Sequence, residues 1–474
     1  TNLIFVVDLT LDIGNLIFFI IMFSTYPAYL LLLDYALLRV FSFYFQPGDW
    51  MNTVLTLFFL SITAALLIAR RREGWYFIAF ELILGGAGGF LSAFGLSLRT
   101  LLLISSALIF IFQKLKHKQL IPLIKENKII SIIFGLLVLS TGISTIVGFF
   151  NGHSVNLVFS DAIPYFFLFY YFPLKELLDN TEFIAFAKKM ILAAIIGNAL
   201  FILLTFIGYS SGWLAMFSPY YHWYRDIGLG KITEMGGNFY RLVLNEQLLL
   251  APILLYWLYK TIKEKITWQN IAVLSALLFV LGINFTRIYH LAIIFGALFL
   301  INKTNWKKAF SIYILSAIIY LTIFCSTNLI ITHGKDTGLN LLLGRAQSIV
   351  DPNAENSSLS RMMLLPKIWE KIKVHPIVGN GLGDSLVVYS PVFKKEITTP
   401  HYDWGYLEII GELGIIGFII WLTLIWILFK QTKNNQLSLS LLISLLIINI
   451  TSPVLFHVMG IVFVIFLLHK KLEY

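Results

Sequence analysis

Arg287 stands in the sequence Ile283–His290, between two strongly apolar stretches of the chain. If those stretches cross a membrane, a charge there is costly, so it should face a cavity in the protein and have a partner. A guanidinium group is a permanent cation whose planar fork matches two phosphate oxygens. Arg287 is therefore a candidate ligand for a phosphate group. The structural alternative is an ion pair with a carboxylate such as Glu246, or a side chain that reaches the membrane surface.

Arg241 and Arg361 are two other arginines that we expect on the same side of the membrane as Arg287. Two or three guanidinium groups that converge would form a pocket suited to a diphosphate. Asn245 lies four residues after Arg241, at the expected start of a helix. Its side chain either caps that helix or lines the same pocket and orients Arg241.

The segment from His401 to Asp403 offers a second kind of chemistry, ahead of a helix that we expect to begin near Tyr406. A neutral histidine can accept a proton from a hydroxyl nucleophile, and a nearby carboxylate can fix its tautomer. His401 is therefore a candidate general base, with Asp403 as its partner and Tyr406 as a supporting residue. The alternative is a histidine in an interfacial loop with no chemical role.

The elements that must position these residues are membrane-spanning helices. Hydrophobic residues make up 58% of the 474 residues and charged residues 13%, whereas soluble domains have about 45–50% and 25%. Lipid must be the solvent for most of this surface. The fold class that we expect is all-α, a polytopic bundle of about fourteen transmembrane helices in a single domain, residues 1–474. The expected spans are 13–33, 52–69, 75–94, 98–113, 129–150, 157–174, 188–208, 242–259, 269–285, 288–301, 309–332, 406–429, 437–450 and 454–468.

The net charge of +10 is gathered in short connectors, a pattern that sets membrane orientation and gives no reason to expect nucleic acid. With both termini in the cytoplasm, every one of these clusters falls inside: Arg70–Arg72, Lys114–Lys128, Lys260–Lys265, Lys303–Lys308, Lys430–Lys433 and His469–Lys471. Two long connectors, 209–241 and 333–405, are then external. The second is large and structured, because residues 359–374 repeat as an amphipathic helix. The cations that lie outside against the rule include Arg225, Lys231, Arg241, Arg287, Arg345 and Arg361.

Several chemistries are excluded by the sequence. Cys325 is the single cysteine, so neither a disulfide nor a thiolate metal site can form. The sequence holds no HExxH motif, no P-loop and no Asp-x-Asp pair, and we expect no metal and no cofactor. The glycine-rich segment Gly379–Gly383 follows no expected strand, so we interpret it as a tight turn that packs on the helices.

The order of motifs in the second half resembles the superfamily of O-antigen ligases and O-antigen polymerases (Wzy type), integral-membrane glycosyltransferases of the GT-C class. The elements that carry the resemblance are Arg361, Trp369, His375-Pro376 and Gly379–Gly383, followed by His401 and then Tyr406–Gly417. The likeness extends over roughly residues 236–425. In one place the chain departs from the family pattern, because an ungapped alignment would put Asp403 at the position of the family histidine. The base is then His401 or Asp403.

The resemblance implies metal-independent transfer of a glycan, with inversion, from undecaprenyl diphosphate to a sugar hydroxyl at the outer face of the bacterial inner membrane. Arg241, Arg287 and Arg361 would hold the diphosphate. We interpret the chain as a polymerase that joins lipid-linked repeat units of O-antigen, capsule or exopolysaccharide. Its partners would be lipid-linked donor and acceptor, membrane lipid and a chain-length regulator protein. The alternatives are a ligase that transfers the glycan to lipopolysaccharide core, and a flippase for lipid-linked sugars.

Overall fold

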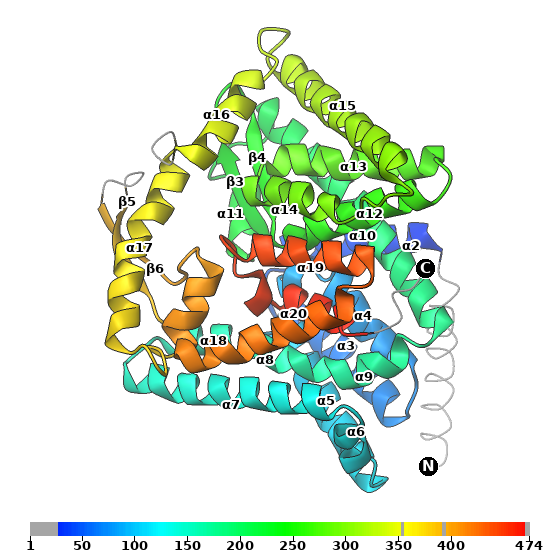
Figure 1. Cartoon of the computed structure of the whole chain (residues 1–474), viewed down its shortest axis with the longest axis vertical. Helices are drawn as coiled ribbons and strands as arrows, with labels where there is room; N and C mark the ends of the chain where they lie inside the picture. The colour runs from blue at the N-terminus through cyan, green and yellow to red at the C-terminus, as the bar shows by residue number, and fades with distance from the viewer. Residues whose placement is uncertain (1–26, 352–354, 391–394, 470–474) are drawn as a thin grey trace. The chain divides into compact units, whose positions relative to one another are not determined.

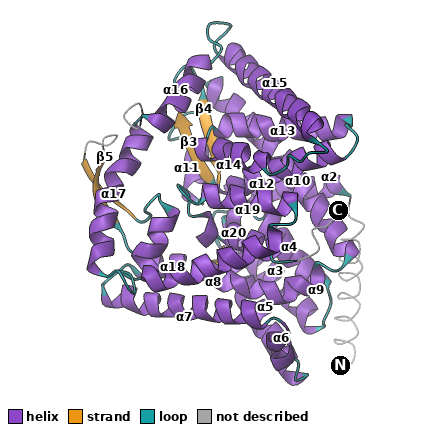
Figure 2. Cartoon of the chain, viewed as in Figure 1, coloured by secondary structure: helices purple, strands orange, loops and turns teal. Residues whose placement is uncertain are grey.

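The structure is a computed structural model that describes residues 27–351, 355–390 and 395–469. About 73% of it is helical, which confirms the expected helical class. The strands of the described residues form three two-stranded sheets. Figures 1 and 2 show the two larger ones, which contain β3 to β6. The three sheets are β1 (Ser92–Ala93) with β2 (Leu96–Ser97), β3 (Gly230–Glu234) with β4 (Tyr240–Leu244), and β5 (Leu386–Ser390) with β6 (Lys395–Thr399). The last hairpin lies within the long connector 333–405, which is therefore structured as expected.

Seven helical segments among the described residues are long and apolar enough to cross a membrane. They are Trp50–Ile68, Leu98–Lys116, Lys128–Phe150, Val155–Leu177, Thr181–Ser210, Trp306–Ile331 and Gly405–Thr432. Four shorter apolar helices are Trp268–Asn284, Arg287–Leu298, Gln436–Ile448 and Val458–Leu467. The count of about fourteen spans stays a prediction, and much of its first span, 13–33, lies outside the described residues.

Several expected spans differ from the helices that form, and two of them show the cause. The span 75–94 is helical only as Glu73–Leu84, because Gly86 and Gly88 adopt positive φ and turn the chain into the β1–β2 hairpin. The span 242–259 begins later, at Leu250, because the residues before it form strand β4 and a 3-10 turn. Apolar composition alone does not separate a strand or turn from a helix, and the backbone geometry decides it.

The chain forms two compact units. The first takes residues 27–120, 173–205 and 214–231 of the described chain. It holds α2 (Ala28–Tyr44), α3 (Trp50–Ile68), α4 (Glu73–Leu84), α5 (Leu98–Lys116), most of α10 (Thr181–Ser210) and α11 (Pro219–Asp226). Its core is aromatic: Tyr76 stacks on Phe186 with ring centroids 5.3 Å apart, beside the buried Tyr35.

The second unit takes residues 121–172, 206–213 and 232–469 of the described chain. Its helices include α6 (Leu120–Glu126), α7 (Lys128–Phe150), α8 (Val155–Phe166), α12 (Leu250–Lys263), α13 (Trp268–Asn284), α14 (Arg287–Leu298), α15 (Trp306–Ile331), α16 (Leu339–Val350), α17 (Asn356–Val374), α18 (Gly405–Thr432), α19 (Gln436–Ile448) and α20 (Val458–Leu467). A short α9 (Tyr171–Leu177) begins in this unit and lies mostly in the first. Helix α17 corresponds to the amphipathic helix expected at 359–374 and begins three residues earlier.

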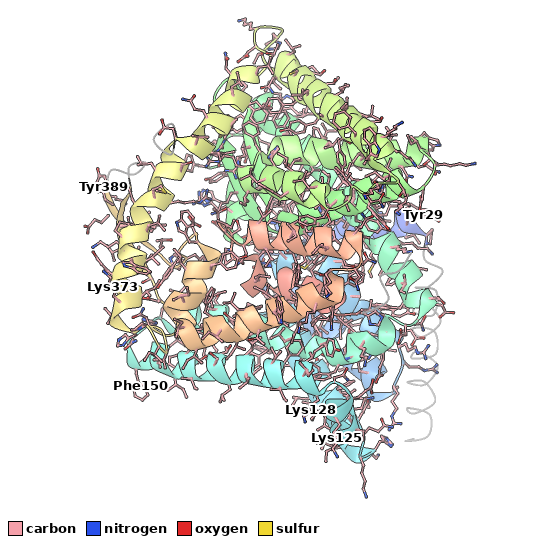
Figure 3. All side chains as sticks on the ribbon, in the orientation of Figure 1. Tyr29, Lys125, Lys128, Phe150, Lys373 and Tyr389 are labelled. Atoms are coloured by element: carbon pink, nitrogen blue, oxygen red, sulfur yellow. The ribbon has the colours of Figure 1, made fainter. Side chains whose placement is uncertain are left out.

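Helix α7 packs along α18 in the second unit (Figure 1). Lys125 and Lys128 flank the start of α7, whereas Phe150 ends it (Figure 3). The charged end is the one that the sidedness rule puts in the cytoplasm.

The glycine-rich segment after α17 packs its backbone directly on these two helices. Leu382 N donates to Ser144 O of α7 at 3.0 Å, and Gly381 N donates to Glu412 O of α18 at 3.2 Å. Gly381 has a φ of 91°, and a Cβ there would stand 2.2 Å from Gly148 N. The segment is therefore a turn that packs on the bundle, as the sequence indicates, and it fixes the end of α17 against α7 and α18.

We predict that Gly381→Ala lowers the thermal unfolding midpoint and reduces the yield of folded protein. The methyl group would meet a backbone atom that cannot move aside, and the left-handed φ adds strain of about 1–3 kcal/mol. Gly135→Ala on α7 is the matched control, because a Cβ at Gly135 meets nothing within 4 Å. Equal midpoints for the two variants would contradict the packing role.

We also predict that position 395 is external and position 263 cytoplasmic. In a chain whose Cys325 is replaced by serine, Lys395→Cys should react with an impermeant maleimide in intact cells with a permeable outer envelope. Lys263→Cys should react only after the membrane is broken. Labelling of position 263 in intact cells would refute the topology.

Candidate active site

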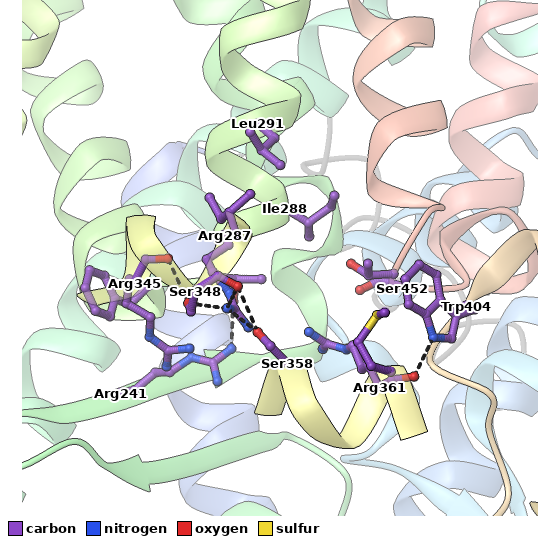
Figure 4. A pocket seen from close by; sticks show the side chains of 15 residues that line it. Arg241, Arg287, Ile288, Leu291, Arg345, Ser348, Ser358, Arg361, Trp404 and Ser452 are labelled. Carbon is purple, nitrogen blue, oxygen red and sulfur yellow. Dashed lines mark hydrogen bonds between the residues drawn. The ribbon is translucent and has the colours of Figure 1, made fainter. Parts of the chain in front are cut away.

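Four arginines line one cavity of about 190 Å³ in the second unit (Figure 4). They come from four elements: Arg241 from β4, Arg287 from the start of α14, Arg345 from α16, and Arg361 from α17. The three arginines singled out from the sequence thus lie together, and Arg345 joins them. The apolar side of the cavity includes Phe285, Ile288, Leu291, Met362 and Trp404.

The turn between α13 and α14 positions Arg287. Phe285 ends α13 in the left-handed conformation with a φ of 52°, which an aromatic residue rarely adopts. Its ring stacks on Phe324, with centroids 5.3 Å apart, and this packing offsets the backbone strain. The tight turn makes Arg287 the first residue of α14 and directs its side chain into the cavity.

Arg241 is held by the same turn. Its Nε donates to Asn284 O and its Nη2 donates to Thr286 Oγ1, both at 2.9 Å. The Asn284 side chain in turn donates to Gln247 Oε1. Burial, followed by the nearby Arg345 and Arg361, lowers the pKa of Arg241 to about 10. The side chain therefore remains a cation at neutral pH, and the charge of Glu355 offsets only part of this lowering.

One carboxylate among the described residues forms ion pairs with this group of arginines. Glu355 lies 3.1 Å from Arg287 Nη1 and 2.5 Å from Arg345 Nη1. Arg241 and Arg361 have no ion pair within the part of the chain that the structure describes. The cavity thus holds a clear excess of positive charge.

Arg361 and Arg345 each have a hydrogen-bond donor that is not in use. The Nε atoms of both side chains are buried, and neither has a hydrogen-bond partner among the described residues. A buried donor without a partner is costly, and a bound acceptor removes the cost. The arrangement suits an anion with several oxygens.

Arg287 is also braced by two serines. It donates to the Ser348 side chain and, at 2.5 Å, to Ser358 Oγ in the first turns of α17. These contacts tie α14 to α16 and α17. The sequence alternative of an ion pair with Glu246 does not form, since the partner of Arg287 is Glu355.

His401 does not line this cavity, although Trp404, three residues later, does. Its Nδ1 lies 3.3 Å from Glu408 Oε1, and its side chain is 53% exposed. When the imidazole is neutral, an Nδ1–H that donates to Glu408 leaves the lone pair of Nε2 to accept a proton. The hydrogen bond to Glu408 raises the pKa of His401, burial opposes the rise, and the charges of Glu408, Asp161 and Asp403 add to it.

The carboxylate that orients His401 is therefore Glu408, and not the expected Asp403. Asp403 is exposed and adopts a left-handed φ of 55°, which points the chain into a tight turn. The charge of Asp403 raises the pKa of His401 less than the charges of Glu408 and Asp161 do. Glu408 lies in the first turn of α18 and is buried. An acidic residue in an apolar helix, one to two turns after the histidine, is the signal in the sequence that identifies it.

The two residues on either side of Asp403 hold the segment. Tyr402 is buried and its hydroxyl donates to Asp384 Oδ2 at 2.7 Å. Trp404 Nε1 donates to Arg361 O at 3.0 Å. The segment with His401 is thus joined on one side to the turn after α17 and on the other to the wall of the arginine cavity.

Neither expected supporting residue lines the cavity. Asn245 is exposed at the start of the 3-10 turn Asn245–Leu249. The Tyr406 hydroxyl donates to Leu446 O at 2.7 Å, and so joins α18 to α19. Gln247 and Asn284 perform the supporting role that we expected of Asn245.

Asp384 and Asp161 are two acidic residues near His401 that have hydrogen-bond partners in the protein. Asp384 accepts hydrogen bonds from Tyr402 and from Lys371 Nζ at 2.6 Å, and Asp161 accepts one from Gly383 N at 3.0 Å. These contacts attach the glycine-rich turn to α17 and α8. Among the described residues, no group of three or more acidic, histidine or cysteine side chains is arranged to hold a metal ion.

A family model described as O-antigen ligase matches residues 271–422. The matched region contains Arg287, Arg345, Arg361, His401 and Glu408, whereas Arg241 lies before it. None of the curated proteins matches the chain.

Proposed function

We propose that this chain transfers a glycan from a polyprenyl diphosphate to a sugar hydroxyl. The proposal rests on membership of the O-antigen ligase and polymerase family, which the match over residues 271–422 supports. The family covers ligase-type and polymerase-type activity. The lipid diphosphate donor, the inverting and metal-independent mechanism, and the location at the outer face of an inner membrane are parts of the proposal.

The observation that carries the proposal is the cavity with four arginines and one ion-paired carboxylate. A lipid diphosphate is a good leaving group once its developing negative charge is stabilised. Arg241 and Arg361 have no carboxylate partner among the described residues, so their guanidinium groups can bind the diphosphate oxygens. Arg287 and Arg345, which share Glu355, border the same space.

His401 is proposed as the general base. Its Nε2 accepts the proton of the acceptor hydroxyl while that oxygen attacks the anomeric carbon of the donor. The bond from the anomeric carbon to the diphosphate oxygen breaks, and its electron pair goes to the diphosphate. A single displacement of this kind inverts the anomeric centre. Glu408 stabilises the imidazolium that forms, and bound substrates must bring the hydroxyl within about 3 Å of Nε2.

We propose a polymerase, whose acceptor is a second lipid-linked repeat unit. A ligase is the second candidate, because the matching family carries that description. The two differ in the acceptor and not in the donor chemistry. Purified chain with lipid-linked repeat unit should form longer lipid-linked glycans. Transfer to added lipopolysaccharide core, without such elongation, would establish the ligase instead.

We predict that Arg361→Ala lowers turnover roughly 10²–10³-fold, because a donor that stabilises the leaving diphosphate is lost. Arg361→Lys should restore little, because lysine lacks the planar fork. Arg241→Ala and Arg287→Ala should abolish detectable polymer, and loss of structural contacts can add to their effect.

The matched control is Lys367→Ala on the same helix, α17. Lys367 is an exposed cation paired with Glu370, and it does not line the cavity. Its removal should leave turnover within about twofold, as for most surface substitutions. Equal turnover in Arg361→Ala and Lys367→Ala would refute the diphosphate role of Arg361.

We predict a pH profile controlled by His401. A base must be neutral, and the pKa of His401 is raised, so turnover should fall as the pH drops through a value above the usual 6.5. His401→Ala should lower turnover roughly 10²–10⁴-fold. Glu408→Gln should move the acidic limb of the profile to lower pH, because it removes the carboxylate that favours the imidazolium.

Asp403→Asn should be milder than either change, since Asp403 is exposed and acts on His401 only through its charge. Size-exclusion profiles that match the wild type will confirm that the variants are folded. An inactive Asp403→Asn beside an active His401→Ala would make Asp403 the base. An acidic limb that stays in place in Glu408→Gln would exclude the orienting role of Glu408.

A further inference from the structure

The first unit contains a second basic cavity, of about 300 Å³, which is separate from the arginine cavity of the second unit. Its cations are Arg70, Arg71, Arg72 and Lys114, and all of its lining residues belong to the first unit. The cavity lies where α3 and α5 end, both of which are long and apolar enough to cross a membrane. By the sidedness rule these ends face the cytoplasm.

The backbone explains why three consecutive arginines reach this cavity. After α3 ends, Arg70 adopts a left-handed φ of 57°, and Arg71 N donates to Leu66 O at 2.8 Å. This cap reverses the chain before α4 begins. The three side chains therefore lie in the short turn between two helices and are not spread along a helical surface.

The charges at the cavity are poorly balanced. Lys114 Nζ pairs with Glu176 Oε1 at 2.9 Å, which is the one ion pair of the cavity within the described residues. The ends of α3 and α5 each add a partial negative charge of roughly one half. Four permanent cations thus exceed the opposing charge.

Arg71 and Arg72 have neither an ion pair nor a side-chain hydrogen bond within the part of the chain that is described. Arg70 donates to the ring of His117. The guanidinium groups of Arg71 and Arg72 are left to bind an external anion.

The rest of the wall is apolar. Trp75, Ile109, Phe110, Pro173 and Leu177 line the cavity together with the cations. Trp75 packs edge-on against Phe110, with ring centroids 6.3 Å apart. Cations beside an aromatic and aliphatic wall, at the ends of apolar helices, match a lipid headgroup with the first carbons of its chains. Basic pockets between helices on the cytoplasmic side are known to bind such headgroups.

We propose that this cavity binds a phosphate group, carried by the headgroup of an anionic phospholipid or present as free phosphate in the cytoplasm. Arg71 and Arg72 provide the fork-shaped donors, and Lys114 adds charge. The apolar wall favours the lipid. The site is independent of the proposed transfer reaction, because none of its residues lines the arginine cavity of the second unit.

The test is the affinity of delipidated, full-length protein in detergent for its first added lipid, measured by native mass spectrometry. The probes are dioleoyl phosphatidylglycerol and dioleoyl phosphatidylcholine, with inorganic phosphate as a competitor. The wild type should bind phosphatidylglycerol more tightly. Arg71→Gln/Arg72→Gln should weaken this binding roughly 10–30-fold, because each basic side chain near a lipid phosphate contributes about a factor of five.

The matched control is Lys116→Gln/Lys118→Gln, which removes the same charge from exposed residues just beyond the cavity. Its affinity should stay within about threefold of the wild type. Arg71→Lys/Arg72→Lys keeps the charge and should retain most of the binding. Thermal unfolding midpoints without added lipid, equal to that of the wild type, will show that each variant is folded.

Two results would support the site and tell its sources apart. Preference for phosphatidylglycerol that depends on Arg71 and Arg72 identifies a lipid phosphate. Stabilisation by millimolar inorganic phosphate that depends on the same arginines, without lipid preference, identifies a soluble phosphate. The proposal would be overturned if Arg71→Gln/Arg72→Gln and the wild type had equal affinity for the lipid. It would also be overturned if the lysine control lost as much affinity, or if the protein bound neither probe.

Discussion

Guanidinium groups that are buried close together repel one another, and each loses the water that would screen its charge. In the second unit, four such groups border one cavity, and Glu355 pairs with two of them. The lowered pKa values of Arg241 and Arg345, caused first by burial, express the same cost. The protein offsets part of it with oxygens of Asn284, Thr286 and Ser348. Binding of an anion, as proposed above, would lower the cost that remains.

That cavity depends on backbone packing some distance away. Arg345 and Arg361 lie on α16 and α17, which belong to the connector between two apolar helices rather than to the helices themselves. Helix α17 is fixed at its far end by the glycine-rich turn, whose backbone contacts α7 and α18. A side chain in that turn would separate the contacts. The position of Arg361 thus depends on glycines that do not line the cavity.

The segment from Tyr402 to Trp404 connects the two chemical parts of the site. Tyr402 bonds to Asp384, which also binds Lys371 of α17, and Trp404 bonds to the backbone at Arg361. His401 begins this anchored segment but keeps an exposed side chain beside Glu408. The proposed base is therefore rigid in its backbone and accessible at its ring. This combination suits the role proposed for it, in which the ring meets a hydroxyl of a glycan acceptor.

The sequence by itself determined the helical class and the amphipathic helix near 359–374, because each depends on composition and periodicity along the chain. It indicated many apolar spans, of which the structure supports seven by length and composition among the described residues. It also identified Arg241, Arg287 and Arg361, since cations on the unexpected side of a membrane stand out in a linear pattern. It did not place Arg345 in the cavity. It also did not identify Glu408, rather than Asp403, as the carboxylate beside His401, or Gln247, rather than Asn245, as the residue that supports the turn at Arg241. Those outcomes depend on the left-handed turn at Phe285, the turn at Asp403 and the packing of α16 and α17. Only the tertiary structure decides them, because a side chain acts on whatever lies near it in space, and the nearest residue in the sequence can face another way.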